Sequence, residues 1–279
     1  MRALYVHAHP DDESIATGLS IAALAEAGHE VHVLTCTLGE QGEVIPPELA
    51  HLDADHDDTL GAHRVGELRA ALAALGAHGH VLGATGARPS RYRDSGMAGS
   101  PSAARPDAFV NADPAEAIGL IREVLDALAP DVVVTYEKGG GYGHPDHIQA
   151  HRLTCAAIAT MASPPPTYAV FTPADWARED RAWVAAHVPA TAGAGIGIPS
   201  PEDPYAVSVL PGHLAAVVHE SPSALERQAA ALRAHATQVT VYDGWFALSN
   251  NVAQRLPGRE AWAVLDPRTG LIRPPEDPR

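Results

Sequence analysis

Two clusters of histidine and acidic residues stand directly behind two hydrophobic runs of the chain. The first, His-Ala-His-Pro-Asp-Asp-Glu at residues 7–13, follows residues 3–6, and the second, Gly-Tyr-Gly-His-Pro-Asp-His at residues 141–147, follows residues 132–136. Ligands bind at the carboxyl ends of the strands in open α/β sheets, where segments distant in sequence meet. Imidazole and carboxylate groups are typical ligands of catalytic zinc. We therefore predict that the two clusters share one catalytic zinc site.

Such a site takes three protein ligands and keeps one coordination position open. The clusters would provide His9, one of Asp11 or Asp12, and a histidine from the second cluster. Adjacent side chains in a strand-to-helix turn point in different directions, so one aspartate can bind the ion while the other reaches a water molecule. The residue types alone do not decide between the two. They are also compatible with iron, so Fe²⁺ is the alternative metal.

Two other interpretations of the first cluster compete with a zinc site. Asp12 and Glu13 could be acids that the helix dipole favours at a helix N-terminus. An acid pair after a first strand also occurs in magnesium-binding phosphoacceptor modules. Magnesium prefers oxygen ligands, however, so His9 and the histidines of the second cluster favour a transition metal.

The second cluster offers groups beyond a metal ligand. Pro145 suits the first turn of a helix, which would point His147 toward the sheet edge. His144 can act as a separate acid or electrostatic group, with Asp146 fixing its tautomer. Tyr142, flanked by glycines, has a hydroxyl donor near the predicted metal, although it could also be an ordinary turn residue.

The elements that must position these clusters alternate between strand and helix up to residue 162. Hydrophobic runs predict strands over residues 4–7, 31–36, 80–82 and 131–136, and helical periodicity predicts helices over residues 14–26, 60–75 and 113–128. Residues 37–58 and 83–112 are expected to be loops. This alternation predicts an α/β fold with a Rossmann-like, mostly parallel sheet flanked by helices.

The pattern weakens after residue 162, with proline at residues 164–166 and alanine- and glycine-rich stretches near residues 190–200. Only short strands at residues 168–171 and 207–210 and a helix at residues 223–234 are predicted there. We expect residues 1–162 to form the catalytic core. Residues 163–279 would form a smaller, irregular α+β lobe that completes the same domain and the substrate pocket.

Composition limits the class of partner. The 279 residues are 46% hydrophobic and 19% charged, as in soluble globular proteins, and the net charge of −15 argues against nucleic-acid and anionic-membrane partners. Cys36 and Cys155 are the only cysteines, which excludes a disulfide framework. A strand begins almost at Met1 and no apolar stretch reaches ~18 residues, so we expect a cytoplasmic protein with a small-molecule substrate. The oligomeric state is not predicted.

Several motifs together resemble the LmbE-like, GlcNAc-phosphatidylinositol de-N-acetylase superfamily of zinc amidohydrolases. They are the His-Pro-Asp-Asp-Glu turn and His-Pro-Asp-His, together with residues 33–40, 64–68, 93–97, 234–238 and 248–251. The likeness is dense to about residue 155 and returns over residues 225–256, while residues 163–220 show little of it.

The resemblance implies a role for each matching residue. It makes His9, Asp12 and His147 the ligands of one Zn²⁺ per chain and Asp11 the general base. His144 and Tyr142 would support the tetrahedral intermediate, with Asp146 behind His144. The pocket for an amino-sugar-inositol substrate would be lined by Arg64, Asp94 and Met97.

The same resemblance implies deacetylation of N-acetylglucosaminyl-inositol to glucosaminyl-inositol and acetate, a step of mycothiol biosynthesis. A mycothiol S-conjugate amidase is the nearest alternative, although such amidases tend to carry lysine after the metal turn, where this chain has Ile15-Ala16-Thr17. A non-catalytic sugar- or nucleotide-binding module is the alternative from another class. The first strand is not followed by Gly-x-Gly-x-x-Gly, which weakens a dinucleotide-binding interpretation.

Overall fold

The computed structural model describes residues 1–189 and 195–275. Within them, a nine-stranded sheet has the order β12-β11-β5-β4-β1-β2-β3, with β6 beside β5 and β7 beside β11. The pairs β1–β2, β1–β4, β4–β5 and β2–β3 are parallel. The predicted α/β fold with a Rossmann-like, mostly parallel sheet is therefore confirmed.

The parallel part of the sheet is formed by β1 (Arg2–His7), β2 (Glu30–Thr35), β3 (His78–Val81), β4 (Val132–Tyr136) and β5 (Thr167–Pro173). Every residue of β4 is buried, as are all residues of β1 after the first. Strands covered on both faces consist of continuous apolar runs, which is why the hydrophobic runs before the two clusters became central strands.

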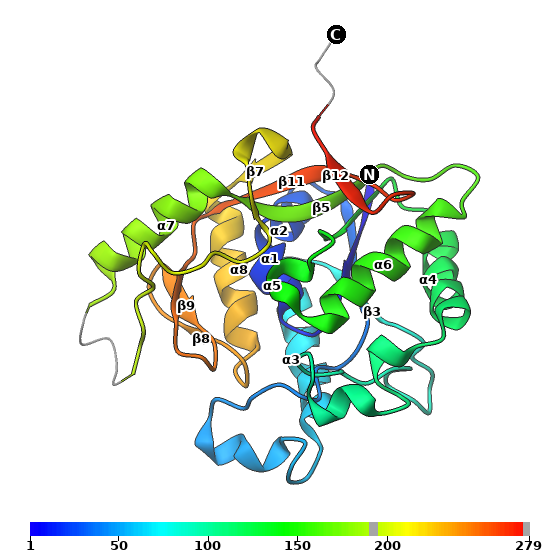
Figure 1. Ribbon diagram of the computed structural model, residues 1–279, viewed down its shortest axis with the longest axis horizontal. Helices are drawn as coiled ribbons and strands as arrows, with labels where there is room; N and C mark the ends of the chain where they lie inside the picture. The colour runs from blue at the N-terminus through cyan, green and yellow to red at the C-terminus, as the bar shows by residue number, and fades with distance from the viewer. Residues whose placement is uncertain (190–194, 276–279) are drawn as a thin grey trace.

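Helices cover both faces of the sheet (Figure 1). Leu4 and Val6 of β1 pack with α4 (Pro114–Leu128) and α6 (Pro145–Ala159) on one face. Ala3 and Tyr5 pack on the other face, which is covered by α2 (Gly18–Glu26), α3 (Leu60–Leu75) and α8 (Pro222–Ala234). The alternation of side chains along β1 therefore builds two separate hydrophobic cores, and the two polar clusters lie where β1 and β4 end.

Sequence predictions for the helices after residue 58 are confirmed. Helix α3 ends at Gly76, which has φ 78°, a conformation that glycine adopts without steric cost. Helix α4 begins after Asp113, whose side chain accepts the backbone N–H of Glu116. The predicted loops contain three short 3₁₀ helices, at Pro47–Leu52, Pro101–Ala104 and Phe109–Asn111.

The single helix predicted over residues 14–26 was wrong. The structure has α1 (Asp12–Ala16) and α2 with a break at Thr17, where φ is −136°. The Thr17 hydroxyl lies 2.7 Å from Nε2 of the buried His7 and donates to the carbonyl of Glu13 at 3.1 Å. Thr17, the residue at the break, is thus the hydrogen-bond partner of Nε2 in the buried His7 ring.

Residues after 162 contribute both to the main sheet and to a smaller one. The main sheet gains β6 (Val209–Leu210), β7 (Ala215–Glu220), β11 (Arg259–Asp266) and β12 (Leu271–Arg273). A separate antiparallel sheet contains β8 (Thr240–Val241), β9 (Trp245–Ala247) and β10 (Ala253–Arg255). Helix α7 (Ala174–His187) was not predicted, whereas the predicted helix at residues 223–234 is α8. The division at residue 162 stays a prediction, and part of the glycine-rich stretch near residues 190–200 lies outside the described residues.

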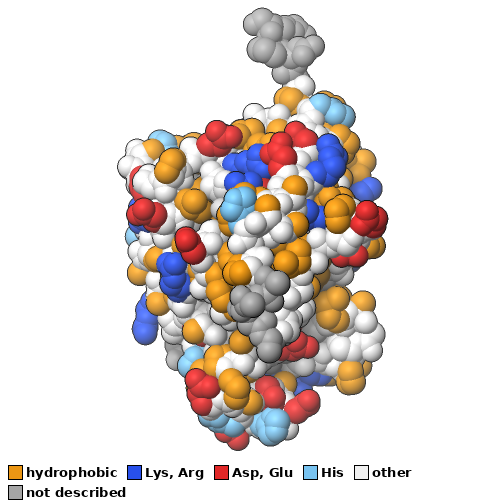
Figure 2. All heavy atoms as spheres, turned by 90° about the vertical axis from the view of Figure 1, so that its left-hand side faces the viewer, with side chains coloured by type: hydrophobic (Ala, Val, Ile, Leu, Met, Phe, Trp, Pro, Cys, Tyr) orange, Lys and Arg blue, Asp and Glu red, His pale blue; other side chains and the backbone are white. Residues whose placement is uncertain are grey.

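Figure 2 shows acidic and basic side chains interspersed over the face that carries α7. Ion pairs of this region join Arg259 to Glu179 and Asp180, and Arg255 to Asp180. None of the described helices combines the length and the apolar character that a bilayer-crossing helix needs.

Candidate metal centre

Three donor groups converge beyond the ends of β1 and β4. Nδ1 of His9 lies 3.3 Å from Oδ2 of Asp12, and Nε2 of His147 lies 3.3 Å from Oδ1 of Asp12. The two ring nitrogens are also 3.3 Å apart. Tetrahedral zinc with bonds of about 2.0–2.1 Å separates its ligand atoms by about 3.3–3.4 Å. The separations match this value, with Asp12 presenting a different oxygen to each histidine, so these three buried side chains could hold one zinc ion.

The second nitrogen of His9 faces two carboxylates. Nε2 lies 3.3 Å from Oδ2 of Asp146 and 3.4 Å from Oδ1 of Asp94. A metal-binding histidine usually donates its other N–H to a carboxylate, which fixes the tautomer and orients the ring. With its proton on Nε2, His9 keeps the lone pair of Nδ1 for a metal. His9, Asp94 and Asp146 are also close enough together to hold an ion, but with the proton on Nε2 the two carboxylates would accept a hydrogen bond from His9 instead.

The carboxylate of Asp146 was expected to lie behind His144, but in the structure it contacts His9 instead. His144 is the N-cap of α6, and its Nδ1 accepts the backbone N–H of Asp146 at 3.1 Å. This capping bond uses the backbone of Asp146, and its carboxylate is hydrogen-bonded elsewhere, to His9 and the backbone N–H of Ser95.

His144 is suited to donating a hydrogen bond rather than binding a metal. Because its Nδ1 accepts a hydrogen bond, the neutral ring carries its proton on Nε2, which lies 4.0 Å from Oδ1 of Asp94. Burial, together with nearby His9 and His147, lowers the pKa of His144 to about 3. Although ligand atoms of the three histidines lie within 4.8 Å of one another, a protonated ring nitrogen cannot bind an ion.

Asp11 has the properties of a general base beside this centre. Its backbone has φ 102°, a conformation that residues other than glycine rarely adopt, and its carboxylate lies 3.0 Å from the Arg64 guanidinium. Burial raises the pKa of Asp11 to about 6, although Arg64 opposes the shift. A carboxylate with a pKa near neutrality can accept a proton efficiently at physiological pH.

The three residues predicted to line the substrate pocket lie in different environments. Arg64 is only 2% exposed and donates to the carbonyls of Pro10 and Gly39, so it braces the turn that carries Asp11. Asp94 is also buried, whereas Met97 is 53% exposed. Substrate contact by these residues stays a prediction.

Tyr142 lies in the short, glycine-rich α5 (Gly140–Gly143) at the edge of the centre and is 57% exposed. Its ring centroid is 5.0 Å from that of His147. The buried Glu137 carboxylate accepts the backbone N–H groups of Gly139 and Gly141 at 2.5 and 2.8 Å. The Tyr142 hydroxyl is thus available to a bound molecule while the backbone beneath it is held in place.

Sequence reasoning missed Tyr136, which contacts two of the three predicted ligands. Its hydroxyl donates to Oδ2 of Asp12 at 2.8 Å and accepts the backbone N–H of Ala8 at 2.9 Å. Its ring stacks on His147 at a centroid distance of 4.4 Å. The sequence did offer a signal for this residue, because Tyr136 ends a buried strand just before the second polar cluster.

Glu13 and His235 were also missed. His235 Nε2 lies 2.7 Å from Oε1 of Glu13, and both side chains are fully buried. Glu13 was interpreted only as a helix-terminal acid, and His235 only as part of a motif that resembles the superfamily. No local pattern connects residues 222 positions apart.

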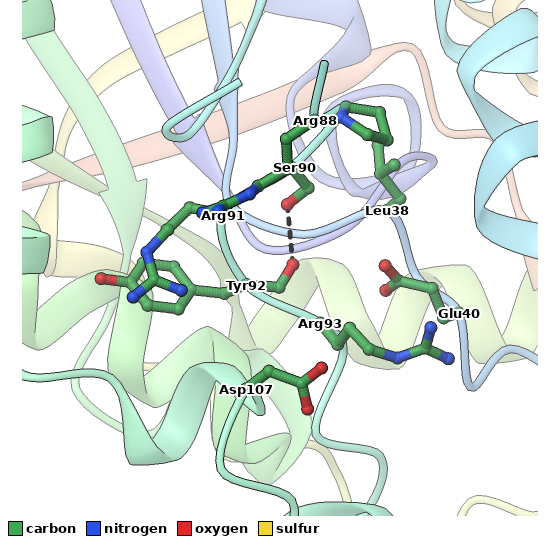
Figure 3. A pocket seen from close by; sticks show the side chains of 9 residues that line it. Leu38, Glu40, Arg88, Ser90, Arg91, Tyr92, Arg93 and Asp107 are labelled. Carbon is green, nitrogen blue, oxygen red and sulfur yellow. Dashed lines mark hydrogen bonds between the residues drawn. The ribbon is translucent and has the colours of Figure 1, made fainter. Parts of the chain in front are cut away.

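A cavity of about 340 Å³ lies next to the centre and is lined by Leu38, Glu40, Arg88, Pro89, Ser90, Arg91, Tyr92, Arg93 and Asp107. Figure 3 shows the Glu40 carboxylate and the Arg93 guanidinium facing each other across it. Glu40 accepts the backbone N–H of Asp94 at 2.9 Å, so the cavity adjoins the wall of the centre. The predicted ligands and pocket residues are not among those that line it.

Known proteins resemble this chain over almost its full length. It is 46% identical over 276 residues to the 1D-myo-inositol 2-acetamido-2-deoxy-alpha-D-glucopyranoside deacetylase of Thermobispora bispora, covering 94% of this chain and 87% of the relative. It is 47% identical over 281 residues to the deacetylase of the same name from Streptomyces avermitilis, covering 98% and 94%.

Solved structures share the fold at lower identity. A deacetylase of teicoplanin biosynthesis, in complex with teicoplanin, has a TM-score of 0.55 and 18% identity over 95% of this chain and 99% of its own. The 4-carboxy-2-hydroxymuconate hydratase of Pseudomonas putida has a TM-score of 0.52 and 20% identity over 85% and 79%. Proteins named for different reactions thus share this architecture, so the fold alone does not identify the reaction. Residues 4–158 match the GlcNAc-PI de-N-acetylase (PIG-L) family, and the chain belongs to that family.

Proposed function

We propose that the protein is a Zn²⁺-dependent deacetylase that hydrolyses the N-acetyl group of N-acetylglucosaminyl-inositol to give glucosaminyl-inositol and acetate. The convergence of His9, Asp12 and His147 at 3.3 Å, with Asp11 beside them, is the observation that carries this proposal. The name and the 46–47% identity of the two curated relatives support this substrate. The protein would then act in mycothiol biosynthesis, in the cytoplasm.

His9, Asp12 and His147 would hold one Zn²⁺ per chain, with Fe²⁺ as the alternative. When bound, the ion polarises the amide carbonyl and lowers the pKa of water toward ~7. The protein supplies the orientation of its ligands, since Asp94 and Asp146 hold His9, and Tyr136 holds Asp12.

Asp11 would take the proton from the attacking water. The Arg64 guanidinium at 3.0 Å fixes the direction of its carboxylate. Tyr142 and the Nε2–H of His144 would donate hydrogen bonds to the oxyanion of the tetrahedral intermediate. The leaving amine needs a proton, which Asp11 would supply by returning the one it accepted. His144 is the alternative acid, but its lowered pKa disfavours the imidazolium form that this role requires.

The burial of the predicted pocket residues gives them different roles in this proposal. The exposed Met97 would contact the sugar-inositol directly. Arg64 would act chiefly through Asp11, because both of its Nη atoms are engaged within the protein. Asp94 would act through His9 and His144, which its buried carboxylate faces.

Acetate release from N-acetylglucosaminyl-inositol, compared with cleavage of a bulky mycothiol S-conjugate, tests the proposal. We expect a higher kcat/KM for the acetylated sugar-inositol. Preference for the conjugate would make the protein an amidase, and binding of the sugar without turnover would make it a non-catalytic binding module. A chelator-treated sample that regains activity with Zn²⁺ would support the metal assignment.

A further inference from the structure

A fully buried pair, Glu13 and His235, joins the metal-binding turn to the far end of the chain. His235 directly follows α8, and its Nε2 lies 2.7 Å from Oε1 of Glu13. Neither side chain is exposed to solvent. Burial of two polar groups is unfavourable unless they are paired, so their occurrence inside the core calls for a specific interaction.

Glu13 uses its two carboxylate oxygens for different purposes. Oε2 accepts the backbone N–H of Asp11 at 3.0 Å, whereas Oε1 accepts the Ser14 hydroxyl at 2.6 Å and faces His235. A continuous chain of hydrogen bonds therefore runs from His235 through Glu13 to the backbone of Asp11.

The backbone of Asp11 needs such support. Its φ of 102° and ψ of −33° lie in a region that a residue with a side chain rarely occupies. Unfavourable backbone conformations persist only where the surroundings impose them. The N–H that Glu13 holds belongs to this strained residue, whose carboxylate is held on its other side by Arg64.

We propose that His235 and Glu13 are positioning residues that hold Asp11 in the orientation required of the general base. The inference rests on the proposed function, because Asp11 is the general base only in that reaction. His235 acts through Glu13, and neither residue needs to touch substrate or metal.

A second bond between the same two elements provides a matched control. Gln228 of α8 donates from Nε2 to the carbonyl of Ser14 at 3.0 Å, and its side chain is buried like that of His235. This bond docks α8 against α1 but does not lead to the N–H of Asp11. A general docking role would therefore make Gln228 as important as His235.

The test compares His235→Leu, His235→Gln and Gln228→Leu in the full-length, zinc-loaded protein. For His235→Leu we expect kcat for acetate release to fall about 10–100-fold while KM and bound zinc stay unchanged, as for other residues that orient a catalytic group. The glutamine amide can donate from nearly the position of Nε2, so His235→Gln should recover most of kcat. Gln228→Leu should keep the wild-type kcat.

Hydrogen exchange of the Asp11 amide gives a second measurement that needs no substrate. Its protection should drop at least about 10-fold in His235→Leu but not in Gln228→Leu, because only the first weakens the Glu13 acceptor. If His235→Leu does not fold, His235→Asn, whose shorter amide cannot reach Glu13, takes its place beside His235→Gln.

An unchanged kcat and Asp11 exchange rate in His235→Leu would overturn the inference, as would equal losses in His235→Leu and Gln228→Leu. A wild-type protein that releases no acetate would refute the proposed function instead. The exchange measurement would then still decide whether the pair holds Asp11.

Discussion

Replacement of Arg64 by methionine tests how the charge of Arg64 affects the pKa of Asp11 and how its hydrogen bonds stabilise the fold. The guanidinium lies 3.0 Å from the Asp11 carboxylate and is 2% exposed, so solvent screens the pair weakly. Methionine keeps much of the volume of arginine but removes the charge and the bonds to the carbonyls of Pro10 and Gly39.

The expected magnitudes follow from this geometry. Burial raises the pKa of Asp11 to about 6, while Arg64 and, more weakly, His235 lower it, so loss of Arg64 removes the larger opposing effect. A neighbouring arginine typically lowers a carboxyl pKa by about 1–3 units, so the acidic limb of the kcat/KM profile should move up by about that amount. Breaking a buried charged pair should also lower the free energy of unfolding by about 3–5 kcal/mol.

The assay is acetate release between pH 5 and 9, with unfolding followed in urea. Arg64→Lys is the control, because it retains the charge near Asp11 but cannot reproduce the planar set of donors. It should keep the acidic limb close to wild type while losing part of the stability. A folded Arg64→Met variant whose acidic limb coincides with that of the wild type would refute the assignment of Asp11 as the titrating base.

Three further predictions concern other supports of the structure. Tyr136→Phe removes the hydrogen bond to Asp12 and should weaken zinc affinity about 10–100-fold, measured by competition with a chelator; unchanged affinity would contradict this role. Asp94→Ala should weaken zinc affinity by a similar factor, because Asp94 orients His9. An unchanged zinc affinity with a raised KM would show instead that Asp94 contacts the substrate. Burial raises the pKa of Glu260 to about 7. Between pH 4.5 and 7 the folded protein therefore keeps a proton on Glu260 that the unfolded chain releases. The free energy of unfolding should fall by about 3 kcal/mol over this range. Glu260→Gln should remove this fall in urea titrations, and an identical pH dependence in both proteins would show that Glu260 is ionised in the fold.

The central strands and their polar ends could be predicted because each depends on a short stretch of sequence. Residues 3–6 and 132–136 are continuous hydrophobic runs, and such runs become strands buried on both faces. Because parallel strands end at the same edge, the fold class brings the two clusters to one edge of the sheet. The pairing of β1 with β4 then places His9 beside His147.

Features that depend on distant partners could not be predicted. The helix breaks at Thr17, whose hydroxyl contacts the buried His7 ring of β1, and helical periodicity contains no information about that contact. His235 reaches Glu13 only because α8 packs beneath the metal-binding turn, 222 residues away in sequence. The carboxylate of Asp146 meets His9 and the backbone N–H of Ser95, two partners from distant segments that the second cluster does not reveal.

The central claim is that Asp12 binds the metal and Asp11 moves the proton. Measuring zinc content and turnover in Asp11→Asn and Asp12→Asn tests it most directly. Asp11→Asn should retain about one zinc per chain and lose about 10²–10⁴-fold in kcat, the range typical of a general base. Asp12→Asn should lose zinc and recover part of its activity when zinc is added in excess, because an amide is a poorer ligand than a carboxylate. A zinc-free Asp11→Asn protein beside a zinc-loaded Asp12→Asn protein would reverse the assignment, and a fully active Asp11→Asn protein would place the base elsewhere.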